Sequence, residues 1–287
     1  MNSTHIYRKC SKTGTFRAAF SRPYGSNATC LEIYKHQFSA VLHSAIYDDS
    51  STKGEREMAE LQSLFRRYDR LVLFDTETTG LTFSRDEIIE FAAVAVEQTA
   101  GGPRVAREYD ELVTLSAGMF VPPQIVSLTG ITDQDIRERG LPKTRVCRDI
   151  AELIAGNTLL LAYNAHFDLS FLYYLLLRHG DPAILKGKDK LDLLTVYRDR
   201  HSYPHRLKDA IDRYGLSGSV VNSHRAVDDV IATLAVAREM ENEKDDLENY
   251  VNLFGYNPKY GISGKAIGSV TYRPQSFDPV KPLYQLP

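Results

Sequence analysis

The chain has 287 residues, of which 43% are hydrophobic, and this composition is that of a globular protein rather than of a disordered chain. Its net charge of -2 conceals an uneven distribution, because residues 1–31 contain five basic side chains and no acid, which leaves the rest of the chain acidic. The three cysteines (Cys10, Cys30 and Cys147) lie far apart and form no C-x-x-C pair, which argues against a disulfide framework or a cysteine metal clip.

The sequence predicts a cytoplasmic protein without a membrane partner. No apolar run approaches the length of a membrane span, and residues 1–30 lack the hydrophobic centre of a secretory signal. An acid-free N-terminus that contains Arg and Ser also resembles an organelle transit peptide, so a targeting role for this segment stays open.

The chain divides into three predicted parts. Residues 1–55 lack sustained periodicity, which predicts a partly disordered N-terminal extension with one helix near residues 34–47. Residues 56–255 have regular hydrophobic periods and predict one folded domain. Residues 256–287 are rich in proline and predict an extended C-terminal tail without a core of its own.

The domain alternates between strand and helix patterns. A helical apolar face formed by Met58, Leu61, Leu64 and Phe65 leads into a first strand that starts at Leu71. Further strands are predicted at 88–98, 107–114 and 158–165, and helices at 144–155, 166–179, 205–214 and from 225 onward. Three strands joined by short turns, followed by strands that alternate with helices, predict an α/β fold with a mixed sheet.

Carboxylates occur at three places where strands end or helices begin. Asp75 and Glu77 follow a buried strand and point to the same face of it, because side chains alternate along a strand. Asp168 and Asp229 lie in the first turns of two predicted helices, and His224 stands five residues before Asp229. Acids near helix N-termini can be purely structural, because they complement the helix dipole and cap backbone N–H groups.

Together these residues make the sequence resemble the DnaQ-like 3′–5′ exonucleases, the DEDDh family to which the epsilon subunit of DNA polymerase III belongs. The motifs match in order: "FDTETTG" at 74–80, "NAHFD" at 164–168 and "HRAVDD" at 224–229. Four further stretches also resemble this family: "IIEFAAVAV", "LTGIT", "LDLLTVYR" and "LKDAIDRYGL". The resemblance covers about residues 71–240, and three ordered motifs are far more specific than one D-x-E pair.

The resemblance implies an RNase H-like fold, with a mixed five-stranded sheet flanked by helices, and a metal-dependent 3′–5′ exonuclease domain over residues 56–255. In that family the acids matched by Asp75, Glu77, Asp168 and Asp229 hold two divalent cations, Mg²⁺ or Mn²⁺, which prefer oxygen ligands. Asp75 would bridge the two ions, Glu77 and Asp229 would hold the one that carries the nucleophilic water, and Asp168 would complete the pair. His224 would accept the proton of that water.

The substrate implied by the resemblance is the 3′ end of single-stranded DNA, from which nucleoside monophosphates are released. The chain would act either as a proofreading subunit that partners a DNA polymerase or as a free-standing repair nuclease. Several proofreading members have a histidine in place of Thr129 and an acid in place of Gln124, so an exoribonuclease or oligoribonuclease remains an alternative. The second alternative is a non-catalytic module that binds nucleic acid or a polymerase. By resemblance, the substrate-binding residues are Thr76, Thr78, Gly80, Leu81, Thr129, Asn164 and Phe167.

Two further polar stretches are given simpler explanations. His201 and His205 are four residues apart, a spacing that can bind zinc on a helix, but Pro204 interrupts it and we expect a turn before a helix. The acidic run at 241–250 is predicted to be the solvated surface of a helix.

Overall fold

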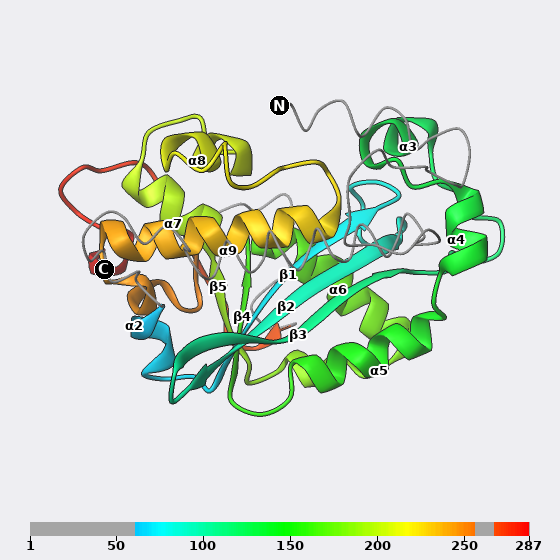
Figure 1. Ribbon diagram of the computed structural model, residues 1–287, viewed down its shortest axis with the longest axis horizontal. Helices are drawn as coiled ribbons and strands as arrows, with labels where there is room; N and C mark the ends of the chain where they lie inside the picture. Colours follow the sequence, from blue (N-terminus) through cyan, green and yellow to red (C-terminus); the bar gives the residue numbers. More distant parts are fainter. Residues whose placement is uncertain (1–60, 256–266, 287) are drawn as a thin grey trace, which may run out of the picture. The chain divides into compact units, whose positions relative to one another are not determined.

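The computed structural model describes residues 61–255 and 267–286, and Figure 1 shows how the helices and strands are arranged. The predicted N-terminal extension and its helix near 34–47 lie outside these ranges. Within them, no helix combines the length and the apolar character that crossing a membrane requires.

A mixed five-stranded sheet with the strand order β3-β2-β1-β4-β5 forms the centre of the fold. β1 pairs antiparallel with β2 and parallel with β4, while β2–β3 is antiparallel and β4–β5 is parallel. The predicted α/β fold with a five-stranded mixed sheet flanked by helices is thus confirmed. The strands are β1 (Arg70–Thr78), β2 (Ile88–Thr99), β3 (Gly102–Leu112), β4 (Thr158–Ala162) and β5 (Asp189–Asp192).

Helices cover both faces of the sheet, and the alternation along β1 divides its side chains between them. Val72 and Phe74 belong to a core cluster with α5 (Lys143–Leu153) and α6 (Ala165–His179). Leu71 and Leu73 are also buried, and alternation turns them to the opposite face. There α9 (Ala226–Glu243) packs on β1 and β2, as the helix lying across the sheet in Figure 1. Burial on both faces explains the continuous apolar run of β1.

Most predicted elements correspond to observed ones. The helices expected at 144–155, 166–179 and 205–214 are α5, α6 and α8 (Leu207–Arg213), and the helix expected from 225 onward is α9. β3 begins at Gly102 rather than at 107, since Pro103 is tolerated on an edge strand. β4 ends at Ala162 rather than at 165 because Asn164 adopts a left-handed conformation (φ 70°) that starts α6.

The elements that we did not predict as separate units are short. α7 (Leu193–Arg200) follows β5 without a loop, because the Asp192 carboxylate accepts hydrogen bonds from the backbone N–H groups of Leu194 and Thr195, both 3.2 Å away. The others include α3 (Pro123–Thr129), α4 (Asp133–Arg139), and the 3₁₀ turns η2 (Pro182–Leu185) and η3 (Leu247–Tyr250). The helix α2 (Gln62–Phe65) corresponds to the helical face that we expected before β1.

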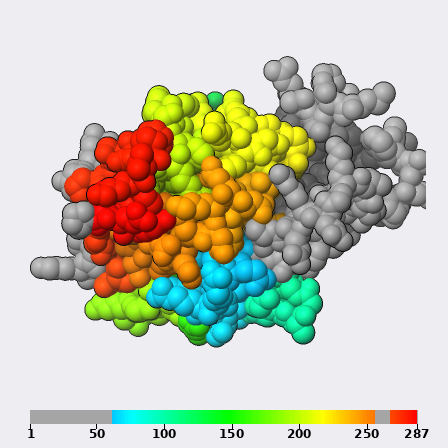
Figure 2. All heavy atoms as spheres, turned by 90° about the vertical axis from the view of Figure 1, so that its left-hand side faces the viewer, coloured from blue at the N-terminus to red at the C-terminus, as the bar shows by residue number. Residues whose placement is uncertain are grey.

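Residues 267–286 pack along the domain. β7 (Thr271–Arg273) pairs in parallel with β6 (Leu253–Gly255), and the turn η4 (Leu283–Gln285) ends the described segment. Ile267 belongs to the main core cluster, and the backbone N–H of Leu283 donates to the Asp199 carboxylate at 2.7 Å. Figure 2 shows the C-terminal residues, in red, against the orange residues of α9 and of the segment that follows it.

Lys190 on β5 holds this C-terminal segment from inside the core. Its buried ammonium donates to the carbonyl oxygens of Leu185 (2.7 Å), Lys188 (2.5 Å) and Ile267 (3.2 Å), and to the hydroxyl of Ser269 (2.9 Å). Burial lowers the pKa of Lys190 to about 8.

The acidic run at 241–250 is a solvated helix surface only in part, and the prediction is wrong for Glu241 and Asp246. α9 ends at Glu243, and the buried Glu241 carboxylate accepts a hydrogen bond from the Ser63 backbone N–H at 2.8 Å. Asp246 is also buried and pairs with Arg200 at 2.5 Å. These acids are buried because segments distant in sequence bring them donors, and local charge density does not reveal such partners.

Candidate active site

Asp75 and Glu77 lie at the carboxyl end of β1. Their odd positions place both side chains on the face of the sheet that α9 covers. In the β1–β2 pairing, Asp75 stands opposite Ala92 and Glu77 opposite Glu90, so a third carboxylate faces the metal-ligand candidates from the neighbouring strand.

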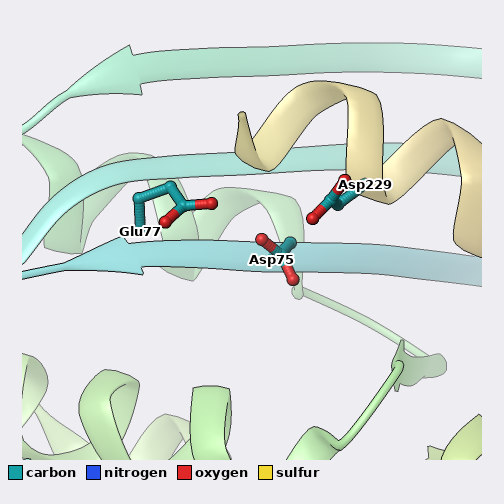
Figure 3. Close-up of side chains that lie close together, drawn as sticks. All are labelled: Asp75, Glu77 and Asp229. Carbon is teal, nitrogen blue, oxygen red and sulfur yellow. The ribbon is translucent and has the colours of Figure 1, made fainter. Parts of the chain in front are cut away.

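Asp229 joins them from the first turn of α9. One carboxylate oxygen from each of Asp75, Glu77 and Asp229 lies within 4.8 Å of the others. Figure 3 shows the Asp229 side chain pointing from the helix towards the two acids of the strand. Asp75 and Asp229 are 154 positions apart in the sequence, and the structure brings them together in one cluster of oxygen ligands.

Asp168 reaches the site from the other face of the sheet, because it lies in the first turn of α6. One of its oxygens, Oδ1, accepts hydrogen bonds from the backbone N–H (3.0 Å) and hydroxyl (2.7 Å) of Thr76. Asp168 is not part of the group of three oxygens within 4.8 Å, although its charge raises the pKa of Asp75. Thr76 thus fixes the carboxylate of Asp168 and leaves its second oxygen, Oδ2, for another ligand.

The four acids share a strongly unfavourable electrostatic environment. Burial, followed by the charges of Asp168, Asp229 and Glu77, raises the pKa of Asp75 well above its usual value. Burial and the charge of Asp229 raise the pKa of Glu77 to about 9. Burial likewise raises the pKa of Asp168 and that of Asp229 to about 7. Bound cations would relieve this repulsion between the carboxylates, because a divalent ion reverses the sign of the local field.

His224 lies two residues before the start of α9 and is exposed. Its backbone is left-handed, with φ 58°, although it is not glycine. Asn222 in the same loop donates from its side-chain amide to Oδ1 of Asp229 at 2.8 Å. His224 is therefore accessible at the N-terminal end of the helix that carries Asp229.

The predicted substrate-binding residues occupy different environments. Thr78 donates from its hydroxyl to the carbonyl oxygen of Gly80 at 2.6 Å, which shapes the turn after β1, and Leu81 beyond it is 73% exposed. Phe167 packs against Phe171 in the core. Thr129 is buried and its hydroxyl donates to the carbonyl of Ile125 in its own helix. Thr76 orients Asp168, and Asn164 starts α6, as described above.

Two site residues went unrecognised in the sequence. Glu90 is fully buried on β2, and its carboxylate pairs with the Arg225 guanidinium at the start of α9. A signal was present, because a carboxylate within the apolar run "IIEFAAVAV" requires a buried partner. Nothing local, however, identifies a partner 135 residues away.

His201 and His205 do not form a metal site in the described ranges. The Nε2 atom of His201 lies 3.1 Å from the Tyr214 hydroxyl, and that of His205 lies 2.9 Å from the carbonyl oxygen of His201. Among the described residues, the three acids at the ends of β1 and α9 are the group whose ligand atoms converge.

The chain is similar in sequence and in fold to known exonucleases. The exonuclease family model of the RNase T type matches residues 72–237. The PolC-type DNA polymerase III of Bacillus subtilis is 33% identical over 176 residues, which are 59% of this chain and 11% of the polymerase. The DNA polymerase III epsilon subunit of Treponema pallidum is 32% identical over 161 residues, which are 54% of this chain and 69% of the subunit.

The similar solved structures include E. coli exonuclease I in complex with a dT13 oligonucleotide, with a TM-score of 0.56 and 25% identity. The similarity covers 63% of this chain and 43% of exonuclease I. The chain thus spans only about a tenth of the PolC-type polymerases that it matches and less than half of exonuclease I.

Proposed function

This chain belongs to the exonuclease family, as its motifs predicted, and we propose that it is a divalent-metal-dependent 3′–5′ exonuclease that releases nucleoside monophosphates from DNA. The observation that carries the proposal is the cluster of Asp75, Glu77 and Asp229, whose ligand oxygens lie within 4.8 Å of one another. The similarity to polymerase-associated exonucleases and to exonuclease I supports the same reaction class.

The donor set fits a hard divalent cation. All candidate ligands are carboxylate oxygens, which Mg²⁺ and Mn²⁺ prefer over the nitrogen and sulfur ligands typical of structural zinc sites. We propose two ions of Mg²⁺ or Mn²⁺, held by Asp75, Glu77, Asp168 and Asp229. When bound, such ions supply charge stabilisation for an in-line displacement at phosphorus.

The protein's own residues then have distinct tasks. The three clustered carboxylates would hold the ions, and Thr76 keeps Asp168 in place through two hydrogen bonds. His224 takes the proton of the water whose oxygen attacks the terminal phosphorus. As the new P–O bond forms, the bond to the 3′ oxygen of the preceding nucleotide breaks, and that oxygen takes up a proton from solvent. The products are a 5′-monophosphate and a strand shortened by one nucleotide with a free 3′ hydroxyl.

DNA is the proposed substrate, and RNA is the second candidate. Exonuclease I, whose fold is similar, was solved with a DNA oligonucleotide, and the similar sequences include DNA polymerase subunits. The buried Thr129 and the exposed Gln124 differ from the proofreading pattern, which keeps an RNA-trimming role open. A polymerase partner is proposed from the same relatives, and the cytoplasmic location remains a prediction from the sequence.

The direct test uses 5′-labelled single-stranded DNA and RNA of the same sequence, each with Mg²⁺, with Mn²⁺ and with excess chelator. We expect a ladder that shortens from the 3′ end of DNA, 5′-monophosphates as products, and no reaction in chelator or with Asp75→Asn. The exposed Glu138 on α4 provides a control, and Glu138→Gln should behave as wild type. Binding of either strand without any shortening would instead support the non-catalytic alternative, and a ladder from RNA alone would reassign the substrate.

A further inference from the structure

Glu90 forms a buried ion pair beside the candidate active site. Its side chain is completely inaccessible on β2, directly opposite Glu77. Both carboxylate oxygens are used: they accept from Nε of Arg225 at 2.9 and 3.2 Å, and Oε1 also accepts from Nη2. Oε2 accepts in addition from the backbone N–H of Ala226 at 2.9 Å, the first residue of α9.

This carboxylate replaces a local helix cap. The N-cap position of α9 is Arg225, and its side chain makes no capping hydrogen bond. Because the first N–H groups of a helix need acceptors, Glu90 satisfies one of them from a strand 136 residues away. The position at which α9 begins is therefore fixed to the sheet rather than to its own loop.

The loop before α9 is fixed on both sides of His224. Asn222 donates to Asp229, Ser223 donates to Asp228, and Arg225 donates to Glu90. His224 itself adopts φ 58°, a left-handed conformation that is unfavourable for a residue with a side chain. Such strain persists where the surrounding structure determines the backbone, and it is common at functional sites.

Charge gives a second reason to assign a role to the pair. A carboxylate opposite Glu77 adds repulsion to a cluster that already has too much negative charge, and like charges on directly paired strand positions are unfavourable. An apolar side chain at position 90 would avoid this repulsion, but it could accept hydrogen bonds neither from the Arg225 guanidinium nor from the backbone N–H of Ala226. What the carboxylate provides at this position is the attachment of the His224 loop.

We propose that Glu90 and Arg225 are a positioning pair that sets the backbone of His224, and through it the imidazole, beside the carboxylate cluster. Neither residue touches the reacting atoms. The inference rests on the proposed exonuclease function, and it extends that function by assigning the placement of the general base to two residues outside the four site acids and His224.

The test is a double-mutant cycle measured at saturating single-stranded DNA and Mg²⁺. Glu90→Gln preserves the size of the side chain but removes its charge and one acceptor oxygen. We expect it to lower kcat roughly 10- to 100-fold, the scale of a small misplacement of a catalytic group, with little change in KM. In the His224→Ala background the same substitution should cause almost no further loss, because the group being positioned is absent.

Arg225→Lys is a second test of the same pair, because it keeps the positive charge but loses the bidentate guanidinium donor. Its loss of kcat should likewise depend on the presence of His224. Asp149→Asn is the matched control. Asp149 is a buried carboxylate on α5 that pairs with Arg145 at 2.8 Å, away from the site, so the variant should lose stability while keeping kcat.

Amide hydrogen exchange at Ala226 gives a readout that needs no activity. Glu90→Gln should speed exchange at that amide more than global destabilisation explains, and Asp149→Asn should not. If Glu90→Gln lowers kcat equally in the wild type and in the His224→Ala background, the inference is overturned, even if the wild type degrades DNA. If no variant or wild type degrades DNA, the proposed function fails, and unchanged exchange at Ala226 would then reject the positioning role separately.

Discussion

Replacing Glu77 by glutamine should stabilise the metal-free protein. Burial and the charges of Asp229 and Glu90 raise the pKa of Glu77 to about 9, whereas its ordinary value is 4.5. A carboxyl group whose pKa is higher in the folded state opposes folding at pH values above its unfolded pKa. The penalty therefore starts near pH 4.5, grows as the pH rises, and is complete near pH 9.

The magnitude at pH 7 follows from the same linkage. The distance from pH 4.5 is about 2.5 units, and at roughly 1.36 kcal/mol per unit the wild type loses about 3 kcal/mol relative to a neutral side chain. Glutamine has nearly the same shape and does not ionise, so Glu77→Gln should be about 3 kcal/mol more stable in chelator. At a Mg²⁺ concentration about 100 times Kd, the wild type should regain about 2.7 kcal/mol, and the variant much less.

Urea denaturation at pH 5, 7 and 9, in chelator and in Mg²⁺, measures both effects. The stability of the wild type in chelator should fall across this range more steeply than that of Glu77→Gln. Glu138→Gln, which removes an exposed carboxylate on α4, should change stability by less than about 0.5 kcal/mol. A wild type that is more stable than Glu77→Gln in chelator at pH 7 would refute the argument from charge repulsion.

Three further outcomes are expected. His224→Ala should lose roughly 10²- to 10⁴-fold in kcat while its Mn²⁺ isotherm matches the wild type; a normal rate would require another base. The stability of the wild type relative to Lys190→Met should rise between pH 8 and 10.5, because the lowered pKa of Lys190 makes the fold resist its charge; urea titrations of the two proteins measure this difference. A chain that begins at Glu55 should keep its turnover number, since every site residue lies later, and a folded but inactive product would contradict this.

The parts of the site that were predictable are those encoded by local periodicity. Asp75 and Glu77 share a face because they are two residues apart on a strand, and Asp229 is presented by the first turn of a helix whose apolar face is visible in the sequence. The family motifs then associated these segments. Local patterns sufficed because the main positions of the site coincide with the ends of regular elements.

The parts that were missed depend on partners distant in sequence. The hydrogen bonds from Thr76 to Asp168 join β1 to α6, and the contact from Arg225 to Glu90 joins β2 to α9. Glu241 is buried for the same reason, since its donor is the backbone of Ser63. No periodicity describes such contacts, because each is a single polar pair whose geometry exists only after the sheet and helices have assembled.

The rigidity of the two elements that carry the cluster explains why the repulsion persists. β1 is the central strand, bonded on both sides, and the start of α9 is attached to β2 through Glu90. The carboxylates therefore cannot move apart without breaking backbone hydrogen bonds or the Glu90–Arg225 pair. Fixed anions in a partly buried site bind cations with little reorganisation. The energy that destabilises the metal-free chain is thus the energy that favours divalent cations, and a substitution that relieves the first must weaken the second.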